Sequence, residues 1–175
     1  MCGIFGLYSY HVEYKRSKIV ECLLHGLQRL EYRGYDSAGL AVDSVPLVDG
    51  EHVGEGPIIV KAKGKVEDLK LLCDATFSRM DVDMNMAFQT QCAIAHTRWA
   101  THGPPSSVNA HPQSSGDDNA FVVVHNGIIT NYNVLKEFLI EKGEKFVSDT
   151  DTEVIAKLCS FVYKSLQGQA SLAEV

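Results

Sequence analysis

The sequence contains no apolar run approaching the ~20 residues that a membrane-spanning helix requires, so we expect no membrane partner. Its first ten residues lack both a basic leader and a long apolar stretch, which argues against a signal peptide. Positive charge is scarce as well, because 16 Lys and Arg stand against 22 Asp and Glu, a formal net charge of -6. This balance repels phosphate backbones and anionic lipids, and we therefore expect no nucleic-acid partner.

Paired cysteines and glycine-rich loops are also missing. The five cysteines are odd in number and widely spaced, with no Cys-x-x-Cys pair, which is typical of a reduced, cytoplasmic chain. No glycine-rich dinucleotide or phosphate fingerprint is present, so we predict neither a nucleotide-binding fold nor a cofactor. What remains is an ordinary globular composition, 175 residues of which 45% are hydrophobic, suited to one domain.

The apolar pattern predicts short strands mixed with amphipathic helices, an α+β chain. We expect strands at 2–8, 38–42, 58–62, 92–97 and 121–125, and helices at 18–30, 66–76 and twice more near the C-terminus. Ser17 is expected to cap the first helix, and Thr150 with Glu153 matches a capping box for the last one. Segment 43–57 is rich in Gly, Pro and acidic residues and is expected to be an exposed loop. Segment 100–119 is rich in Pro, Ser, Gly, Asn and His, and 79–90 has no assigned form.

The last two helices are expected after residue 130. In the first of them Val134, Leu135, Phe138 and Leu139 share one face, which predicts that this face is buried.

Cys2 is the first candidate for chemistry. Initiator methionine is usually removed before a small residue, so the mature chain would begin with this cysteine, whose free α-amine has a reference pKa of ~7.7–8.0. One residue then supplies both a thiol nucleophile and a base that can take its proton. The alternative is a small apolar residue buried on a strand, as most cysteines are.

A second candidate is the segment 96–103, which leaves an apolar strand with a guanidinium, an indole and an imidazole at the mouth of a loop. Arg98 offers a planar fork suited to a carboxylate, and Trp99 is suited to the wall of a pocket. A structural ion pair beside a core tryptophan is the alternative. The spacing of the nearby histidines at 96, 102, 111 and 125 matches no zinc pattern, so we predict no metal site.

Asn126-Gly127 follows an apolar strand. Asn-Gly is a strong hairpin signal, yet the return run is only Ile128-Ile129. The other interpretation is an oxyanion hole, in which the Asn126 amide and the Gly127 N–H donate to one developing negative oxygen. Asp151 is suited to recognise a substrate ammonium, although an acid in a first helical turn is also stabilised by the helix dipole alone.

Taken in order, these blocks resemble the class II glutamine amidotransferases, which use an N-terminal cysteine. Within them the chain is most similar to the subfamily of glutamine–fructose-6-phosphate aminotransferases. The blocks that carry the resemblance reach nearly the whole chain: Met-Cys-Gly-Ile-Phe-Gly at 1–6, Tyr-Arg-Gly-Tyr-Asp-Ser-Ala-Gly at 32–39, His-Thr-Arg-Trp-Ala-Thr-His-Gly at 96–103, Asn-Ala-His-Pro at 109–112, His-Asn-Gly-Ile-Ile at 125–129 and Ser-Asp-Thr-Asp-Thr-Glu at 148–153.

The resemblance implies a role for each matching residue. Cys2 would be the nucleophile and its α-amine the base. Arg98 would bind the α-carboxylate of L-glutamine and Asp151 its α-ammonium, while Asn126 and Gly127 would form the oxyanion hole. Arg33 would help to order the N-terminus, and the pocket would be lined by Trp99, Thr101, His102 and His111.

The resemblance also implies a fold, the four-layer α-β-β-α sandwich of N-terminal nucleophile hydrolases. The family's glutaminase domain continues beyond residue 175, so residues 1–175 are expected to be a C-terminally incomplete glutaminase domain. They lack the two sugar-isomerase domains that bind fructose 6-phosphate, and the full-length enzyme could be a homo-oligomer. Two alternatives stay open: an amidotransferase for another acceptor, and a fragment that binds glutamine without cleaving it, as retention of Met1 would produce.

Overall fold

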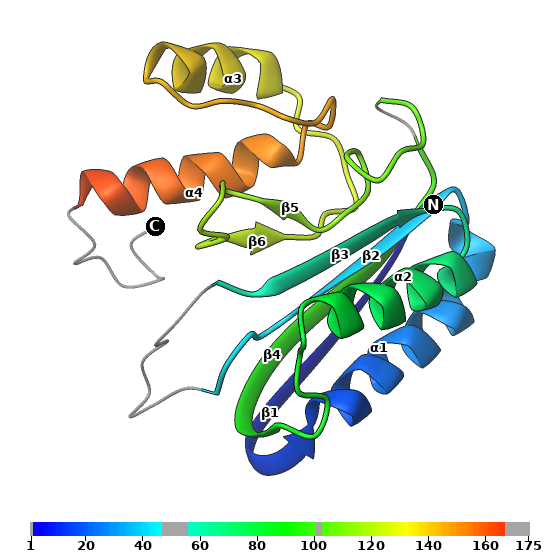
Figure 1. Ribbon diagram of the computed structural model, residues 1–175. Helices are drawn as coiled ribbons and strands as arrows, with labels where there is room; N and C mark the ends of the chain where they lie inside the picture. The colour runs from blue at the N-terminus through cyan, green and yellow to red at the C-terminus, as the bar shows by residue number, and fades with distance from the viewer. Residues whose placement is uncertain (1, 47–55, 101–102, 167–175) are drawn as a thin grey trace.

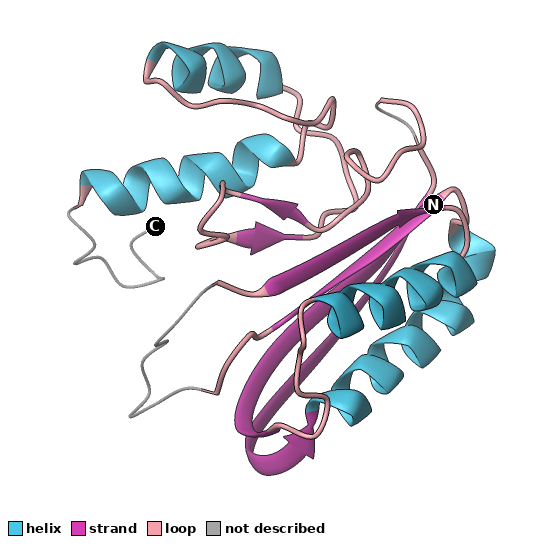
Figure 2. Cartoon of the chain, viewed as in Figure 1, coloured by secondary structure: helices cyan, strands magenta, loops and turns pink. Residues whose placement is uncertain are grey.

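The computed structural model describes residues 2–46, 56–100 and 103–166. Its elements run in the order β1 (Gly3–Lys15), α1 (Arg16–Leu30), the 3₁₀ turn η1 (Glu31–Arg33), β2 (Ser37–Val42), β3 (Ile58–Lys63), α2 (Val66–Arg79), β4 (Ala87–Arg98), β5 (Gln113–Ser114), β6 (Val122–Val123), α3 (Tyr132–Glu141) and α4 (Glu153–Ser165) (Figures 1 and 2). Mixed helices and antiparallel sheets confirm the predicted α+β class. None of the described helices is long and apolar enough to cross a membrane.

Four antiparallel strands form the main sheet, in the order β1-β4-β2-β3. The register pairs Gly3 with Thr97 at one end and Tyr10 with Thr90 further along. The beginning of β1 and the end of β4 therefore lie at the same edge of the sheet. This pairing places Cys2 next to the residues that follow β4. The predicted nucleophile therefore lies beside the predicted Arg98 segment.

Helices α1 and α2 cover one face of this sheet (Figure 1). One stripe of α1 is fully buried, through Ile19, Leu23 and Leu27, as the 3.6-residue period requires. Alternate residues of β1 face the same core, and Phe5 lies so close to α1 that a Cβ at Gly26 would stand 2.5 Å from its ring. The hydrophobic core thus sits between the sheet and these two helices.

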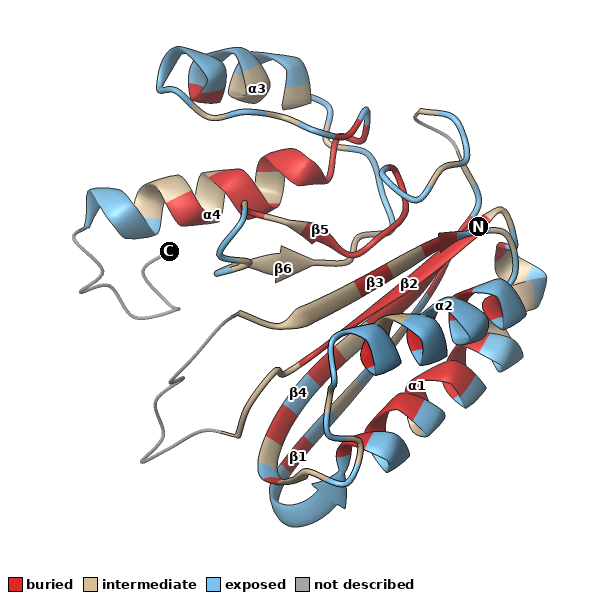
Figure 3. Ribbon diagram, viewed as in Figure 1, coloured by how far each residue is buried: buried red, intermediate tan, exposed pale blue. Residues whose placement is uncertain are grey.

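The second half of the chain lies on the other face of the sheet. The β5–β6 pair packs under α4, and α3 packs on α4 through a T-shaped contact of Phe138 with Phe161 at 5.5 Å (Figure 1). The loop before β5 approaches β2 very closely, because a Cβ at Gly39 would lie 2.2 Å from the His111 carbonyl oxygen. Figure 3 shows buried segments at this junction, in β2 and around β5.

Both predicted helix caps are wrong. Helix α1 begins at Arg16, and its first amides, those of Arg16 and Ser17, donate to the carbonyls of Met86 and Met84, so no side-chain cap is needed. Helix α4 begins at Glu153 without a side-chain cap. The Glu153 carboxylate instead accepts from the amides of Val147 and Ser148, at 3.0 and 2.7 Å, which lie before Thr150.

The remaining differences concern length and burial. Strands β1 and β4 extend well beyond the predicted 2–8 and 92–97, whereas only Val122–Val123 of the run 121–125 pairs as a strand. On α3 only Leu139 is buried and Val134 and Phe138 are exposed, because this helix lies at the surface and packs mainly on α4. Part of the predicted loop 43–57 and the C-terminal residues 167–175 lie outside the described residues.

Candidate active site

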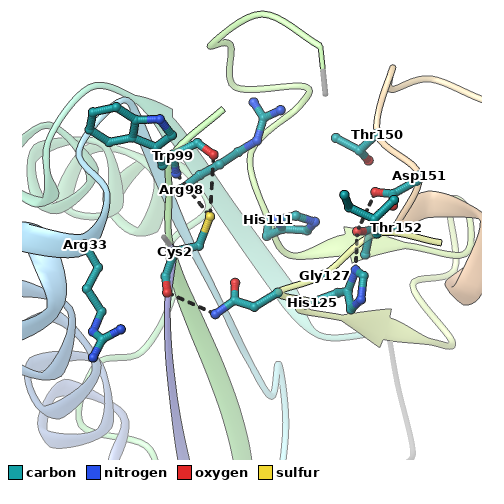
Figure 4. A pocket seen from close by; sticks show the side chains of 12 residues that line it. Cys2, Arg33, Arg98, Trp99, His111, His125, Gly127, Thr150, Asp151 and Thr152 are labelled. Carbon is teal, nitrogen blue, oxygen red and sulfur yellow. Dashed lines mark hydrogen bonds between the residues drawn. The ribbon is translucent and has the colours of Figure 1, made fainter. Parts of the chain in front are cut away.

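A cavity of about 400 Å³ opens at the edge where β1 begins and β4 ends. One wall comes from the main sheet and the 3₁₀ turn after α1, and the opposite wall comes from the segments after β6 and before α4 (Figure 4). Its lining consists of Cys2, Arg33, Arg98, Trp99, His111, His125, Asn126, Gly127, Ile128, Thr150, Asp151 and Thr152.

The Cys2 side chain lies against the backbone that follows β4. The Trp99 amide donates to Cys2 Sγ at 3.2 Å, and Sγ lies 3.6 Å from the Trp99 carbonyl oxygen (Figure 4). The Asn126 amide nitrogen donates to the Cys2 carbonyl oxygen at 3.0 Å. Both sides of the cavity therefore hold this residue, and a backbone N–H faces the sulfur on which a thiolate would carry its negative charge.

The Arg98 side chain is almost fully buried, with 3% of its surface exposed. Its guanidinium donates to the carbonyl oxygens of Gly103 and Pro104, at 3.2 and 3.4 Å. Burial lowers the pKa of Arg98, while the carboxylates of Asp36 and Asp151 act in the opposite direction. Because a guanidinium stays protonated in proteins, the cavity holds a fixed positive charge.

The rim of the cavity carries Trp99 and Arg33. The Trp99 ring is half exposed and packs edge-on against Tyr35, with centroids 5.3 Å apart. The Arg33 Nε donates to the Tyr32 hydroxyl at 2.8 Å, and its guanidinium lies over the same ring. Figure 4 places Arg33 on the opposite side of Cys2 from Asp151.

Asp151 supplies the negative charge of the opposite wall. Its Oδ2 accepts from the Ile129 amide at 2.7 Å, and Oδ1 lies 3.4 Å from the Thr152 hydroxyl, which contacts His125 Nδ1 at 3.2 Å. This carboxylate is buried just before α4 and so ties the segment after β6 to the start of the helix.

Two buried histidines pack together at the cavity, where His111 belongs to the lining and His96 lies behind it. His96 of β4 is fully buried, its Nε2 lies 2.9 Å from Asn126 Oδ1, and its ring packs edge-on against His111 at 4.5 Å. Burial lowers the pKa of His96 to about 4 and that of His111 to about 2, so both rings are neutral at pH 7. Within the described part of the chain, no three His, Cys, Asp or Glu side chains gather as metal ligands.

A glutamine amidotransferase domain model matches residues 54–169. The chain belongs to the glutamine amidotransferase domain family. It is 51% identical over 97% of its length to rat glutamine–fructose-6-phosphate aminotransferase [isomerizing] 1, and 51% identical over 94% of its length to the enzyme of that name from Saccharomyces cerevisiae. It covers 24% and 22% of these two relatives, so it spans about a quarter of their length.

A solved structure shares the fold of this amidotransferase domain. The structure of the allosteric regulatory enzyme of purine biosynthesis superposes with a TM-score of 0.59 at 23% identity. The match covers 94% of this chain and 32% of the other.

The site residues that the sequence predicts for an amidotransferase lie together wherever the structure describes them. Eight line the cavity described above: Cys2, Arg33, Arg98, Trp99, His111, Asn126, Gly127 and Asp151. Thr101 and His102 lie outside the described residues. The prediction missed four lining residues, namely His125, Ile128, Thr150 and Thr152, although each adjoins or lies within a matching block.

Asp36 is a further residue that the prediction missed, because it acts from behind the lining. Its carboxylate accepts from the Ala100 amide and from the Ser37 hydroxyl, and its own amide donates to the Arg98 carbonyl oxygen at 3.2 Å. These bonds hold the backbone on both sides of Trp99. The only signal in the sequence was its position inside the block 32–39.

Proposed function

We propose that this chain hydrolyses the side-chain amide of L-glutamine, with Cys2 as nucleophile once Met1 has been removed. One observation carries the proposal: a cysteine lies in a cavity between a fixed positive charge, Arg98, and a buried carboxylate, Asp151. An α-amino acid presents a carboxylate and an ammonium on one carbon, and these two charges are complementary to it. Arg98 binds the carboxylate of glutamine, and Asp151 binds its ammonium.

The first chemical step forms a thioester. The α-amine of Cys2, with a reference pKa of ~7.7–8.0, takes the thiol proton directly or through a water. The thiolate attacks the side-chain carbonyl carbon, and the carbonyl oxygen becomes an oxyanion that the Asn126 amide and the Gly127 N–H stabilise. The C–N bond then breaks, the amine base returns its proton to the leaving group, and ammonia departs.

The second step releases glutamate. A water gives a proton to the α-amine and attacks the γ-glutamyl thioester, and a second oxyanion forms in the same place. The oxyanion collapses, the C–S bond breaks, and the departing thiolate takes the proton back from the α-ammonium. The products are glutamate and ammonia, and Cys2 is restored. Trp99, Thr101, His102 and His111 line the pocket in this scheme, and Arg33 orders the N-terminus.

We further propose that the chain acts as the glutaminase part of a longer, cytoplasmic protein. Its relatives are named for fructose 6-phosphate and are about four times as long. The ammonia would then be passed to fructose 6-phosphate, bound by sugar-isomerase domains outside these 175 residues, in a protein able to form homo-oligomers. Formation of glucosamine 6-phosphate by the longer protein tests this acceptor, and glutamate release with no sugar product would refute it.

The finer fold that we propose is the four-layer α-β-β-α sandwich, of which residues 1–175 form a part. Two features support it. Helices α1 and α2, the main sheet, the β5–β6 pair and α4 already follow one another in that order. In addition, Ile4, Tyr8 and Tyr10 are exposed on the face of β1 turned away from α1, where a wider second sheet would cover them. A structure of the longer protein that leaves this face open would refute the proposal.

The decisive experiment compares Cys2→Ala with Cys22→Ala. Cys22 is a partly buried cysteine on α1 outside the cavity, so its variant controls for loss of a thiol. We expect glutamate release to vanish in Cys2→Ala and to persist in Cys22→Ala. An electrophilic glutamine analogue should add once to Cys2, as read by intact mass, and free glutamine should slow that reaction. Full activity in Cys2→Ala would refute the proposed function.

A further inference from the structure

A short chain of hydrogen bonds links the core of the main sheet to the backbone of Cys2. It begins at the His96 ring on β4, which has no exposed surface, and passes through the Asn126 side chain. The two bonds are 2.9 Å, from His96 Nε2 to Asn126 Oδ1, and 3.0 Å, from Asn126 Nδ2 to the Cys2 carbonyl oxygen. Neither the predicted site nor the proposed mechanism assigns a role to His96.

The Cys2 carbonyl oxygen determines which group donates and which accepts in these two hydrogen bonds. A backbone carbonyl oxygen can only accept, so the NH₂ end of the Asn126 amide must face Cys2. The oxygen end then faces His96, and the nitrogen at 2.9 Å must donate to it. His96 is therefore the tautomer with its hydrogen on Nε2. Turning the Asn126 amide over would set two acceptors, the amide oxygen and the Cys2 carbonyl oxygen, against each other.

This orientation fixes both hydrogens of the Asn126 amide nitrogen. One is donated to the Cys2 carbonyl oxygen. The second remains, and because Asn126 lines the cavity it is available to an oxygen held there. Were the amide reversed, the cavity would meet a carbonyl oxygen, which would repel an oxyanion.

We propose that His96 is a positioning residue, which through Asn126 anchors the backbone of Cys2 and keeps an amide hydrogen directed at the developing oxyanion. This role rests on the proposed glutamine hydrolysis. His96 itself contacts no substrate: it lies on the sheet side of Asn126, packed against the His111 ring. His96 thereby fixes which end of the Asn126 amide faces the sheet, although Asn126 itself is exposed.

Two variants separate positioning from simple filling of the core. His96→Gln keeps an N–H donor the same number of bonds from Cα as Nε2, whereas His96→Met has similar length and no donor. We expect His96→Met to lower kcat for glutamine hydrolysis ~10–100-fold with KM nearly unchanged, because the oxyanion contact exists only in the transition state. His96→Gln should recover most of kcat even if both variants lose similar thermal stability.

A double-mutant cycle gives the second readout. If His96 acts through Asn126, adding His96→Met to Asn126→Ala should reduce kcat little beyond Asn126→Ala alone. Wild-type kcat in His96→Met would overturn the positioning role. So would a double variant whose kcat falls by the product of the two single-variant factors, because the two residues would then act independently.

The side-chain amide signals of Asn126, measured by NMR, keep the inference separate from the proposed function. We expect them to shift in His96→Met and to return toward their wild-type values in His96→Gln, whether or not the wild-type chain hydrolyses glutamine. If the wild-type protein is inactive but these shifts are present, the proposed hydrolysis is refuted and the hydrogen bond from His96 to Asn126 stands. Unchanged Asn126 signals in His96→Met would show that His96 does not hydrogen-bond to Asn126.

Discussion

Gly34→Ala should disable the site without changing any residue that lines it. Gly34 has extended backbone, with φ at -172°, so alanine meets no conformational penalty there. The added Cβ would nevertheless lie 2.6 Å from the Arg98 carbonyl carbon and 2.9 Å from the Trp99 nitrogen. Carbon atoms in contact stand ~3.5–4.0 Å apart, so the Arg98–Trp99 peptide must move by about 1 Å.

That peptide carries the N–H which donates to Cys2 Sγ, and it is anchored on both sides by Asp36. Overpacking of this kind costs about 1–3 kcal/mol of stability. A misplacement of ~1 Å near the reacting atoms costs on the order of 100-fold in rate. We therefore expect Gly34→Ala to fold with a lowered melting temperature and to hydrolyse glutamine about 100-fold more slowly.

The matched control is Gly6→Ala on β1. Its added Cβ would come no closer than 3.8 Å to the Ala93 carbonyl oxygen, which is ordinary contact. Initial rates of glutamate release and thermal unfolding, measured on both variants, decide the matter. Wild-type kcat in Gly34→Ala would refute the steric argument, and an equal loss in Gly6→Ala would show that the loss does not come from the contact with the Arg98–Trp99 peptide.

Two further predictions concern charge. Asp151→Asn removes the carboxylate proposed for the substrate ammonium while keeping an oxygen for the Ile129 amide. The KM for glutamine should therefore rise ~10–100-fold, equivalent to about 1.4–2.8 kcal/mol. An unchanged KM in steady-state kinetics would contradict the proposed role of Asp151. The second concerns His96, whose folded pKa of about 4 lies below the ordinary ~6.5. Between these two values the unfolded chain binds more protons than the folded chain, so the free energy of unfolding falls as the pH drops through that window. The loss from this group is about 3 kcal/mol at pH 4. Urea unfolding of wild type and His96→Gln at pH 7 and 4.5 checks this, and equal pH dependence in both would count against it.

The sequence predicted those parts of the fold that depend on local pattern. Apolar runs marked the first half of β1 and the second half of β4. The other half of each strand is amphipathic or polar and becomes strand only because the two pair with each other, as Tyr14 does with Phe88. The predicted cap of α1 failed for a similar reason. The amides of Arg16 and Ser17 are satisfied by carbonyls some 70 residues away, which no local signal reveals.

The candidate site shows the same division. Cys2, Arg98 and Asn126 were recognisable because their chemistry stands out and their blocks match a family. Asp36 and His96 act on backbone or on another side chain, so their importance depends on which atoms the fold brings within 3 Å. A carboxylate in a loop and a histidine at the end of a strand are common in proteins where neither supports a site, and only the fold tells the two cases apart.

The two charges proposed for glutamine are coupled through the protein as well as through the substrate. The carbonyls that hold the Arg98 guanidinium belong to Gly103 and Pro104. Asn109 donates to that same Pro104 carbonyl oxygen at 3.0 Å, and its side chain also bonds the Asp149 amide at 2.9 Å.

Asp149 stands two residues before Asp151, so a single buried amide connects the support of the cation to the segment that carries the anion. Asn109 does not line the cavity, so it reaches the two charged residues only through the backbone segments that support them.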